Sequence, residues 1–377
     1  MERHYVPETD VELTKADFTS DQMVKWCPGC GDHAILASLL QTFPKTHHKK
    51  ENICMVSGIG CSSRIPYYVD TYGFHGIHGR ACAIATGVKI ANPALSVWIN
   101  MGDGDSMAIG GNHLIHIVRR NLDVNITLFN NEIYGLTKGQ YSPTTKFGQV
   151  TKTSPFGTID YPFTPGELIM GAQGTFFARS IDVNAKLTTD VMEQAANHSG
   201  ASVVEVLQNC VIFNNKAHDA ITNREWREDR TIILEHGKPM IFGKNRDKGI
   251  RFNGTKLEVV TIGENGITEN DLLIHDETTE DNGIHTMLAR MKGDMPIALG
   301  VIRAVKKATY TEMFEDQMNE VIANAKYKCV DDLLNSGDTW EVYQGSDGYR
   351  WRRTAANGRV VGASTQGYSN RQDCVEN

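Results

Sequence analysis

Between residues 33 and 210, short β-branched runs alternate with helical stretches, and this alternation constrains the fold more than any other feature. The runs predict buried strands at 52–57, 96–101, 124–130, 175–181 and 202–207. The stretches between them predict helices at 33–43, 79–92, 110–121 and 188–199, the last beginning at a Thr/Asp cap. Strands separated by helices form a parallel sheet covered on both faces, so we predict an α/β fold. Ligands of such sheets bind at the carboxyl ends of the strands.

The rest of the chain does not keep this alternation. We predict an N-terminal arm at 1–24, the α/β domain at 25–215, an irregular C-terminal extension at 216–305, a helical linker at 306–338 and a tail module at 339–377. The tail alternates aromatic and polar residues around two turns, which predicts a β-hairpin or small meander. It is similar to small ββα modules of unknown function, but without their full helix. Its role is either to cover an edge or to dock a partner.

Composition excludes several classes of protein. The net charge of −7 and the lack of a basic stripe disfavour a nucleic-acid partner. No apolar run approaches the roughly 20 residues that span a bilayer, and the N-terminus lacks an apolar signal region, so we expect a cytoplasmic protein without a membrane partner. Eight cysteines in 377 residues are too few for a disulfide scaffold. Thiols that lie together are therefore expected to serve a metal or catalysis.

A glycine-rich loop, "GDGDSMAIGG", follows the predicted strand at 96–101 and leads into a helix. Its glycines, Gly102 and Gly104 among them, allow close backbone approach to a phosphate, and the helix N-terminus favours an anion. Asp103 and Asp105 would repel that phosphate unless a cation such as Mg²⁺ lay between them. Asn131 ends the next strand 28 residues after Asp103, and the carbonyl of Ile133 adds an oxygen ligand. A metal–diphosphate site is predicted.

Four cysteines follow predicted strands or form a short motif. Cys27 and Cys30 lie in "WCPGCG", which is compatible with a redox dithiol, half of a zinc site, part of an iron–sulfur site or coincidence. Cys61 follows the strand at 52–57 and Cys210 follows the strand at 202–207, so both lie at carboxyl ends near the diphosphate loop. The residues alone support only the first three as one site. The remaining cysteines are expected to be ordinary thiols: Cys54, Cys82, Cys329 and Cys374.

The motifs, taken together and in order, resemble a known family. A GDG followed 25–30 residues later by Asn resembles thiamine diphosphate enzymes. The segments "WCPGCG", "GIGCSSR", "HGRACAIATGVKIAN", "GDGDSMAIGGNHLIH" and "NNEIYGLTKGQYSPT" are similar to the β subunit of a 2-oxoacid:ferredoxin oxidoreductase, specifically the 2-oxoglutarate type. The resemblance covers roughly residues 20–305.

The resemblance implies cofactors and site residues. It implies thiamine diphosphate, Mg²⁺, coenzyme A as cosubstrate and one [4Fe–4S] cluster on Cys27, Cys30, Cys61 and Cys210, with a Cys₄ zinc site as the alternative. Arg64 is expected to bind the substrate's C1 carboxylate, and Lys138 a second carboxylate, which would favour 2-oxoglutarate over pyruvate. The other residues expected to bind the cofactor or to contact the reacting atoms are Gly60, Ser62, His78, Gly102, Asp103, Gly104, Asp105, Asn131 and Leu136.

The implied activity is oxidative decarboxylation of a 2-oxoacid to acyl-CoA, CO₂ and reduced ferredoxin, or the reverse carboxylation. Only one α/β domain is recognisable in the sequence. An α subunit is therefore expected to supply both the glutamate that activates the cofactor and the CoA site. The expected assembly is αβ or (αβ)₂. Three alternatives remain open: an enzyme for pyruvate or for many 2-oxoacids, a non-redox thiamine decarboxylase with structural zinc, and a diphosphate-binding module without catalysis.

Overall fold

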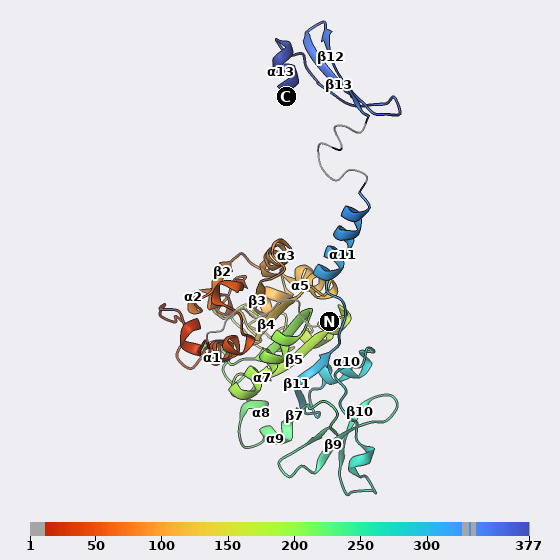
Figure 1. Cartoon of the computed structure of the whole chain (residues 1–377). Helices are drawn as coiled ribbons and strands as arrows, with labels where there is room; N and C mark the ends of the chain where they lie inside the picture. The colour runs from red at the N-terminus through yellow and green to blue at the C-terminus, as the bar shows by residue number, and fades with distance from the viewer. Residues whose placement is uncertain (1–11, 326–331, 333–336, 377) are drawn as a thin grey trace. The chain divides into compact units, whose positions relative to one another are not determined.

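The computed structural model describes residues 12–325, 332 and 337–376, so Cys329 lies outside the described residues. The chain divides into two compact units, one ending at Met313 and one beginning at Phe314 (Figure 1). Among the residues described, no helix is both long enough and apolar enough to cross a membrane.

The first unit is built on an eight-stranded sheet with strand order β2-β1-β3-β4-β6-β5-β11-β7. Every neighbouring pair is parallel except β11 and β5, which are antiparallel. The strands are β1 (Ile53–Ser57), β2 (Tyr72–His75), β3 (Ser96–Gly102), β4 (Val124–Asn130), β5 (Phe176–Ile181), β6 (Ala201–Leu207), β7 (Thr231–Ile233) and β11 (Ile297–Ala304). The predicted α/β fold is confirmed, with a mixed rather than purely parallel sheet.

Helices cover both faces of this sheet (Figure 1). One face packs against α1 (Asp32–Thr42) and α7 (Ala185–Asn197). The other packs against α3 (Ala81–Ala91), α5 (Gly111–Arg119), α6 (Pro165–Gly171) and α10 (Gly283–Arg290). The shorter helices of this unit are η1 (Lys15–Phe18), η2 (Phe43–Thr46), η3 (Lys50–Asn52), η4 (Ser62–Arg64), α2 (Ile65–Tyr68), α4 (Asp103–Met107), α8 (Asp219–Thr222), α9 (Arg227–Arg230) and η5 (Glu269–Asp271).

The start of α7 differs from the prediction. The helix begins at Ala185 because Asn184 is its cap and accepts a hydrogen bond from the Leu187 amide at 3.2 Å. Thr188, the predicted cap, lies inside the helix, where its buried hydroxyl bonds to Ser180 and to the Asn184 carbonyl. An asparagine three residues earlier therefore determines where the helix begins.

The segment after residue 215 is more regular than predicted. It adds β7 and β11 to the main sheet and forms a second, antiparallel sheet of order β10-β9-β8. These strands are β8 (Ile241–Phe242), β9 (Lys248–Phe252) and β10 (Leu257–Thr261). They are two to five residues long, which is too short for a clear alternation in the sequence. The expectation of an irregular extension was wrong here.

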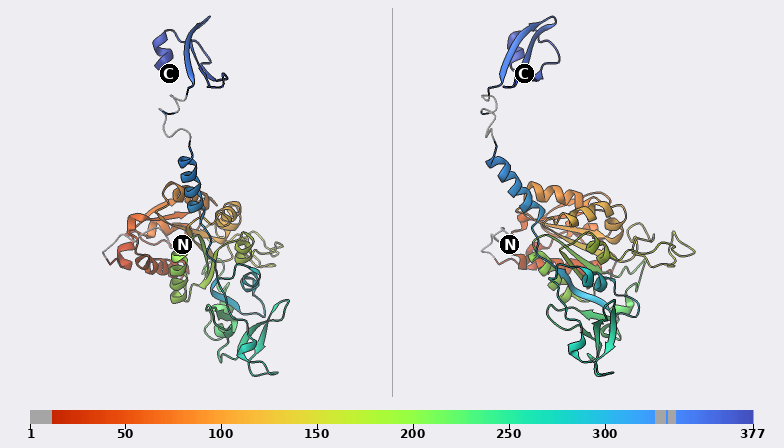
Figure 2. Two further views of the ribbon diagram at one scale, coloured as in Figure 1. Left: turned by 45° about the vertical axis from the view of Figure 1, so that its right-hand side comes forward. Right: turned by 90° about the vertical axis from the view of Figure 1, so that its right-hand side faces the viewer.

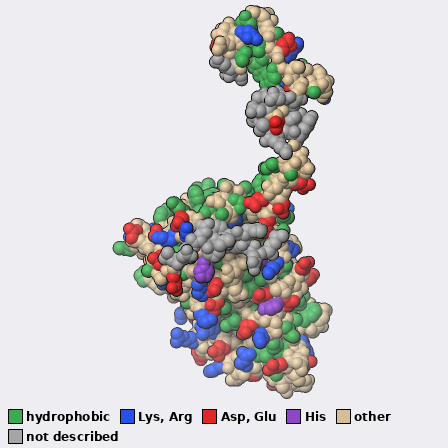
Figure 3. Space-filling view, viewed as in Figure 1, with side chains coloured by type: hydrophobic (Ala, Val, Ile, Leu, Met, Phe, Trp, Pro, Cys, Tyr) green, Lys and Arg blue, Asp and Glu red, His purple; other side chains and the backbone are tan. Residues whose placement is uncertain are grey.

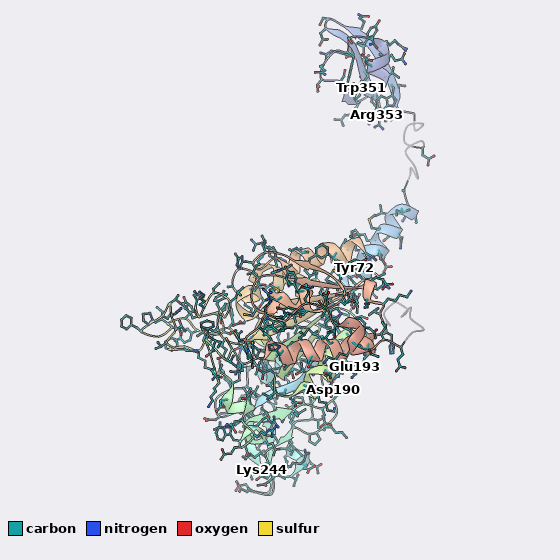
Figure 4. All side chains as sticks on the ribbon, turned by 90° about the vertical axis from the view of Figure 1, so that its left-hand side faces the viewer. Tyr72, Asp190, Glu193, Lys244, Trp351 and Arg353 are labelled. Atoms are coloured by element: carbon teal, nitrogen blue, oxygen red, sulfur yellow. The ribbon has the colours of Figure 1, made fainter. Side chains whose placement is uncertain are left out.

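The second unit contains a three-stranded antiparallel sheet, which confirms the predicted small meander. Its elements are β12 (Thr339–Gly345), β13 (Gly348–Thr354), β14 (Val360–Ala363) and a short helix, α13 (Arg371–Glu376), while α11 (Tyr310–Ala323) runs across the division between the units. Trp340 and Trp351 pack with ring centroids 5.4 Å apart; Trp351 is labelled in Figure 4. The β13 arginines pair with carboxylates of the same unit: Arg350 with Asp347, Arg352 with Glu341 and Arg353 with Asp338.

Candidate active site

A cavity of about 450 Å³ lies at the carboxyl ends of β1, β3 and β4. Its walls come from the loops that follow these strands, from the loop after β2 and from Asp32 at the start of α1. Eleven of the predicted site residues line it: Gly60, Cys61, Ser62, His78, Gly102, Asp103, Gly104, Asp105, Asn131, Ile133 and Leu136. The topology therefore brings together four loops that are far apart in the sequence.

Asp103 begins α4 directly after β3, and its carboxylate is buried. The Oδ2 atom accepts hydrogen bonds from the Ser142 and Thr144 hydroxyls, both at 2.5 Å. Burial raises the pKa of Asp103 to about 6, although these two hydroxyls act in the opposite direction. No Lys or Arg of the described residues forms an ion pair with Asp103. A buried carboxylate without a cationic partner is a suitable ligand for a divalent cation.

Asp105 joins three of the loops. Its Oδ1 atom accepts hydrogen bonds from the Gly79 amide at 2.7 Å and from the Ile59 amide at 3.2 Å. Its Oδ2 atom is buried and has no hydrogen-bond partner among the described residues. Burial raises the pKa of this carboxyl group. Asp105 therefore holds the loops after β1 and β2 against α4 while one oxygen stays unpaired.

Asn131 and Ile133 lie just past the end of β4. The Asn131 Oδ1 atom accepts from the Ile133 amide at 3.1 Å, which forms a tight turn. Between them Glu132 has a φ of 57°, a left-handed conformation that is uncommon outside glycine and concentrates at functional sites. The Tyr134 ring packs so closely on Gly104 that a Cβ there would lie 2.1 Å from a ring carbon. Only glycine fits at position 104.

The four cysteines predicted as one site lie on three linked segments. Trp26 donates its indole N–H to the Cys61 carbonyl at 2.8 Å, and the Gln208 amide nitrogen lies 3.3 Å from the Cys30 sulfur. A Cβ built on Gly135 would lie 3.5 Å from the Cys210 sulfur and 3.7 Å from the Cys61 sulfur. Gly135 also lines the cavity, so these two sulfurs lie next to its wall.

The cysteines differ in exposure, Cys27 being exposed and Cys210 buried. Burial raises the pKa of Cys30 far above its usual range and that of Cys61 to about 12, so without a metal both are neutral thiols. In the described part of the chain, no three His, Cys, Asp or Glu side chains are arranged to hold a single metal ion. A tetrahedral zinc site needs four donors around one point. An iron–sulfur cubane binds each thiolate to a different iron, so its cysteines surround a larger volume.

Arg64 and Lys138 do not line the cavity. The Arg64 guanidinium donates to the Tyr68 hydroxyl at 2.7 Å and lies over the rings of Tyr67 and Tyr68. Lys138 is exposed and has a φ of 77°, in the loop whose residues Leu136 and Gln140 do line the cavity. Arg64 therefore ends the short helix η4, whose residue Ser62 lines the cavity, and Lys138 lies on a loop that borders it.

Several residues that the sequence reasoning missed contact the predicted ones. Ser142 and Thr144 fix Asp103, and both fall in the "YSPTT" segment that carries the family resemblance. Asp32 is buried, lines the cavity and has one oxygen, Oδ2, without a partner among the described residues. Burial raises its pKa to about 7, against the hydrogen bond that it shares with Cys30. Asp32 lies two residues after Cys30, and this position in the sequence could have identified it as a site residue.

Known proteins resemble this chain over most of its length. Residues 58–206 match the thiamine pyrophosphate enzyme, C-terminal TPP binding domain family. The 2-oxoglutarate oxidoreductase subunit KorB of Mycobacterium tuberculosis is 46% identical, over 89% of this chain and 91% of that protein. The β subunit of 2-oxoacid:ferredoxin oxidoreductase 1 of Aeropyrum pernix is 40% identical, over 58% of this chain and 68% of that protein. A solved structure also resembles this chain: the 2-oxoglutarate:ferredoxin oxidoreductase from Magnetococcus marinus with 2-oxoglutarate, coenzyme A and succinyl-CoA bound. The two structures superpose with a TM-score of 0.69 and 27% sequence identity, over 86% of this chain and 96% of that chain.

Proposed function

This chain belongs to the β subunits of the 2-oxoacid:ferredoxin oxidoreductases, and we propose that it acts on 2-oxoglutarate with coenzyme A. The reaction converts 2-oxoglutarate, coenzyme A and two oxidised ferredoxins to succinyl-CoA, CO₂, two reduced ferredoxins and one proton. The reverse carboxylation uses the same site. The observation that carries the proposal is the match to a 2-oxoglutarate oxidoreductase subunit along nearly the whole of both chains.

The cavity residues fit thiamine diphosphate and Mg²⁺. Asp103, Asn131 and the Ile133 carbonyl would hold the metal ion, because all three lie on the cavity wall and offer the oxygen ligands that Mg²⁺ prefers. Gly102 and Gly104 would allow the diphosphate to approach the backbone. When bound, thiamine diphosphate supplies the carbanion chemistry of decarboxylation. The protein orients it: Ser142 and Thr144 fix Asp103, and Asp105 holds the loops around it.

The cysteine segments fit an iron–sulfur cluster next to this cavity. Cys27, Cys30, Cys61 and Cys210 would be its four ligands, and iron would displace the protons from the buried thiols. The contacts of Trp26 with Cys61 and of Gln208 with Cys30 hold the three segments together. When bound, the cluster supplies one-electron transfer toward ferredoxin.

Arg64 and Lys138 would bind the two carboxylates of 2-oxoglutarate. Arg64 offers a planar guanidinium, which suits the C1 carboxylate, and the tyrosines around it fix its direction. Lys138 is a cation on the loop that borders the cavity, and a second carboxylate would neutralise it once the loop is covered. Pyruvate lacks that second carboxylate.

An α subunit completes this site in the proposed αβ or (αβ)₂ assembly. It would bring the glutamate that activates the cofactor and the coenzyme A site, because the described residues form one α/β domain.

The decisive experiment is reconstitution from anaerobically purified subunits. The chain alone is expected to contain about four irons and four acid-labile sulfides, and to oxidise 2-oxoglutarate only after the α subunit is added. One zinc per chain in place of iron would contradict the redox function. Turnover by the isolated chain near the rate of the complex would contradict the shared active site.

A further inference from the structure

A long segment beside the cavity exposes an unusual number of large apolar side chains. This arm, residues 146–163, extends away from the body of the first unit (Figure 2, right; Figure 4). Phe156 is 100% exposed, Tyr161 88% and Ile159 85%. The other exposed apolar residues of the arm are Phe147, Val150 and Phe163. The rings of Phe147 and Tyr161 stack with their centroids 5.3 Å apart. Exposed apolar side chains gathered in one segment in this way mark an interaction site.

The arm has a defined backbone conformation rather than being a loose loop. Gly148 donates to the Thr158 carbonyl at 2.8 Å, and Thr158 donates back to the Gln149 carbonyl at 3.0 Å. A Cβ at Gly157 would lie 2.6 Å from the Gly148 carbonyl oxygen, so only glycine allows the two sides to approach this closely. Because its shape exists before any partner binds, less conformational entropy is lost on docking.

The base of the arm is part of the candidate active site. Ser142 and Thr144, just before the arm, bond to Asp103, and the Lys152 amide donates to the Gly139 carbonyl at 3.3 Å. Ile109 and Leu136 line the cavity and are also exposed, and Leu136 belongs to the loop that the Lys152 amide contacts. A protein that docked on the arm would therefore lie beside the cavity.

We infer that the arm is the docking element for the α subunit, which it seats over the cofactor cavity. This inference rests on the proposed function, in which a second chain must bring a carboxylate to this cavity. Beyond Lys146, which pairs with Glu132 at 3.3 Å, the arm carries one cation, Lys152, and one anion, Asp160. That balance gives no attraction to an anionic membrane or nucleic acid. A second copy of this chain would bring a second cofactor site rather than the missing domain.

The test measures binding of the purified α subunit to variants of this chain. The triple variant Phe156→Ser/Ile159→Ser/Tyr161→Ser is expected to weaken α binding at least about tenfold, because buried aromatic side chains dominate protein interfaces. Its iron content and circular dichroism are expected to stay unchanged. The matched control is Phe252→Ser/Val259→Ser/Ile274→Ser, which alters three exposed apolar residues of the small sheet and near it and is expected to bind α like the wild type.

A photo-crosslinking residue in place of Phe156 gives a second test, which detects contact with the α subunit directly and does not depend on weakened binding. It is expected to join the α subunit in the assembled complex. Equal α affinity of the triple variant and the wild type would overturn the inference and leave the proposed function intact. A crosslink only to a second copy of this chain would overturn it as well. If wild-type chain does not bind the α subunit at all, the proposed function and the inference both fail.

Discussion

Two buried polar regions of the first unit differ in whether their charged side chains find hydrogen-bond partners within the protein. Around the cavity, Asp32 and Asp105 each keep a buried oxygen without a partner among the described residues. In the Arg303 cluster the guanidinium donates to the carbonyls of Gly174, Thr279 and Glu280 and to His285 Nδ1, at 2.8–2.9 Å.

The two regions are therefore expected to respond differently to substitution. The buried Arg303 charge is hydrogen-bonded within the protein, whereas an unpaired buried oxygen on a cavity wall is costly and is available to a ligand. On this basis, substitutions in the Arg303 cluster should change stability, and those at the cavity should change ligand binding.

The largest expected effect is in the Arg303 cluster. Arg303→Met leaves three carbonyls and one imidazole nitrogen unpaired, and should lower the free energy of unfolding by about 3–5 kcal/mol. Urea unfolding followed by circular dichroism measures this. The control Arg290→Met removes a surface pair with Glu167 and should cost much less. Equal losses in both variants would remove the distinction between the regions.

A substitution of Asp103 at the cavity should change ligand binding rather than stability. Asp103→Asn should reduce Mg²⁺-dependent affinity for thiamine diphosphate at least about 100-fold, or about 3 kcal/mol. Unfolding free energy of the cofactor-free protein should not fall, because a buried charge without a cation is removed. Calorimetric titration and iron analysis check both statements. Loss of iron together with the cofactor would show that Asp103 is structural instead.

Lys138 is an exposed charge at the edge of the cavity, and its substitution should change substrate binding. In the αβ complex, Lys138→Ala should raise KM for 2-oxoglutarate by one to two orders of magnitude, about 1.5–3 kcal/mol for a charged hydrogen bond. Pyruvate turnover should change little or rise. The control is Lys244→Ala, which alters an exposed lysine near β8 (Figure 4). A similar response of both substrates would remove Lys138 as the selector.

The smallest expected effect is a pH dependence in the Arg303 cluster. Burial lowers the pKa of His285, opposed by its bond to the Asp276 carbonyl and helped by the Arg303 charge. The folded protein therefore binds fewer protons than the unfolded chain, and stability is lost as pH falls from about 6.5 through the folded-state pKa. His285→Gln removes this titration, so its stability deficit relative to wild type should shrink between pH 7.5 and pH 5.5. A constant deficit would contradict the assignment.

The sequence predicts most of the main sheet because its buried strands are β-branched runs. The prediction for β4 matches its observed bounds, since all seven of its residues are buried. β2 was missed because it is four residues long and exposed at the sheet edge, where hydrophobic side chains gather over α2, β2 and α3 (Figure 3). β11 is an apolar run, but no sequence pattern shows that it pairs antiparallel with β5.

The candidate site shows the same limit. Motifs in "GDGDS" and "NNEIYG" point to the cavity wall because parallel strands end at one edge. The contact of Ser142 with Asp103 joins residues 39 positions apart, and only the folded loops bring them together. The sequence also does not reveal that Asp105 holds two loops, whereas Asp103 keeps its carboxylate at the cavity without an ion-pair partner.

Gly135 has a consequence for electron tunnelling. It forms part of the cavity wall, and a Cβ built on it would lie within 3.7 Å of the sulfurs of both Cys61 and Cys210. Tunnelling rates fall exponentially with the distance between donor and acceptor. Cys61 lines the cavity and Gly135 packs beside it, so a donor bound in the cavity would lie close to an acceptor on these sulfurs. A side chain at position 135 would press on both sulfurs and would be expected to lengthen that gap.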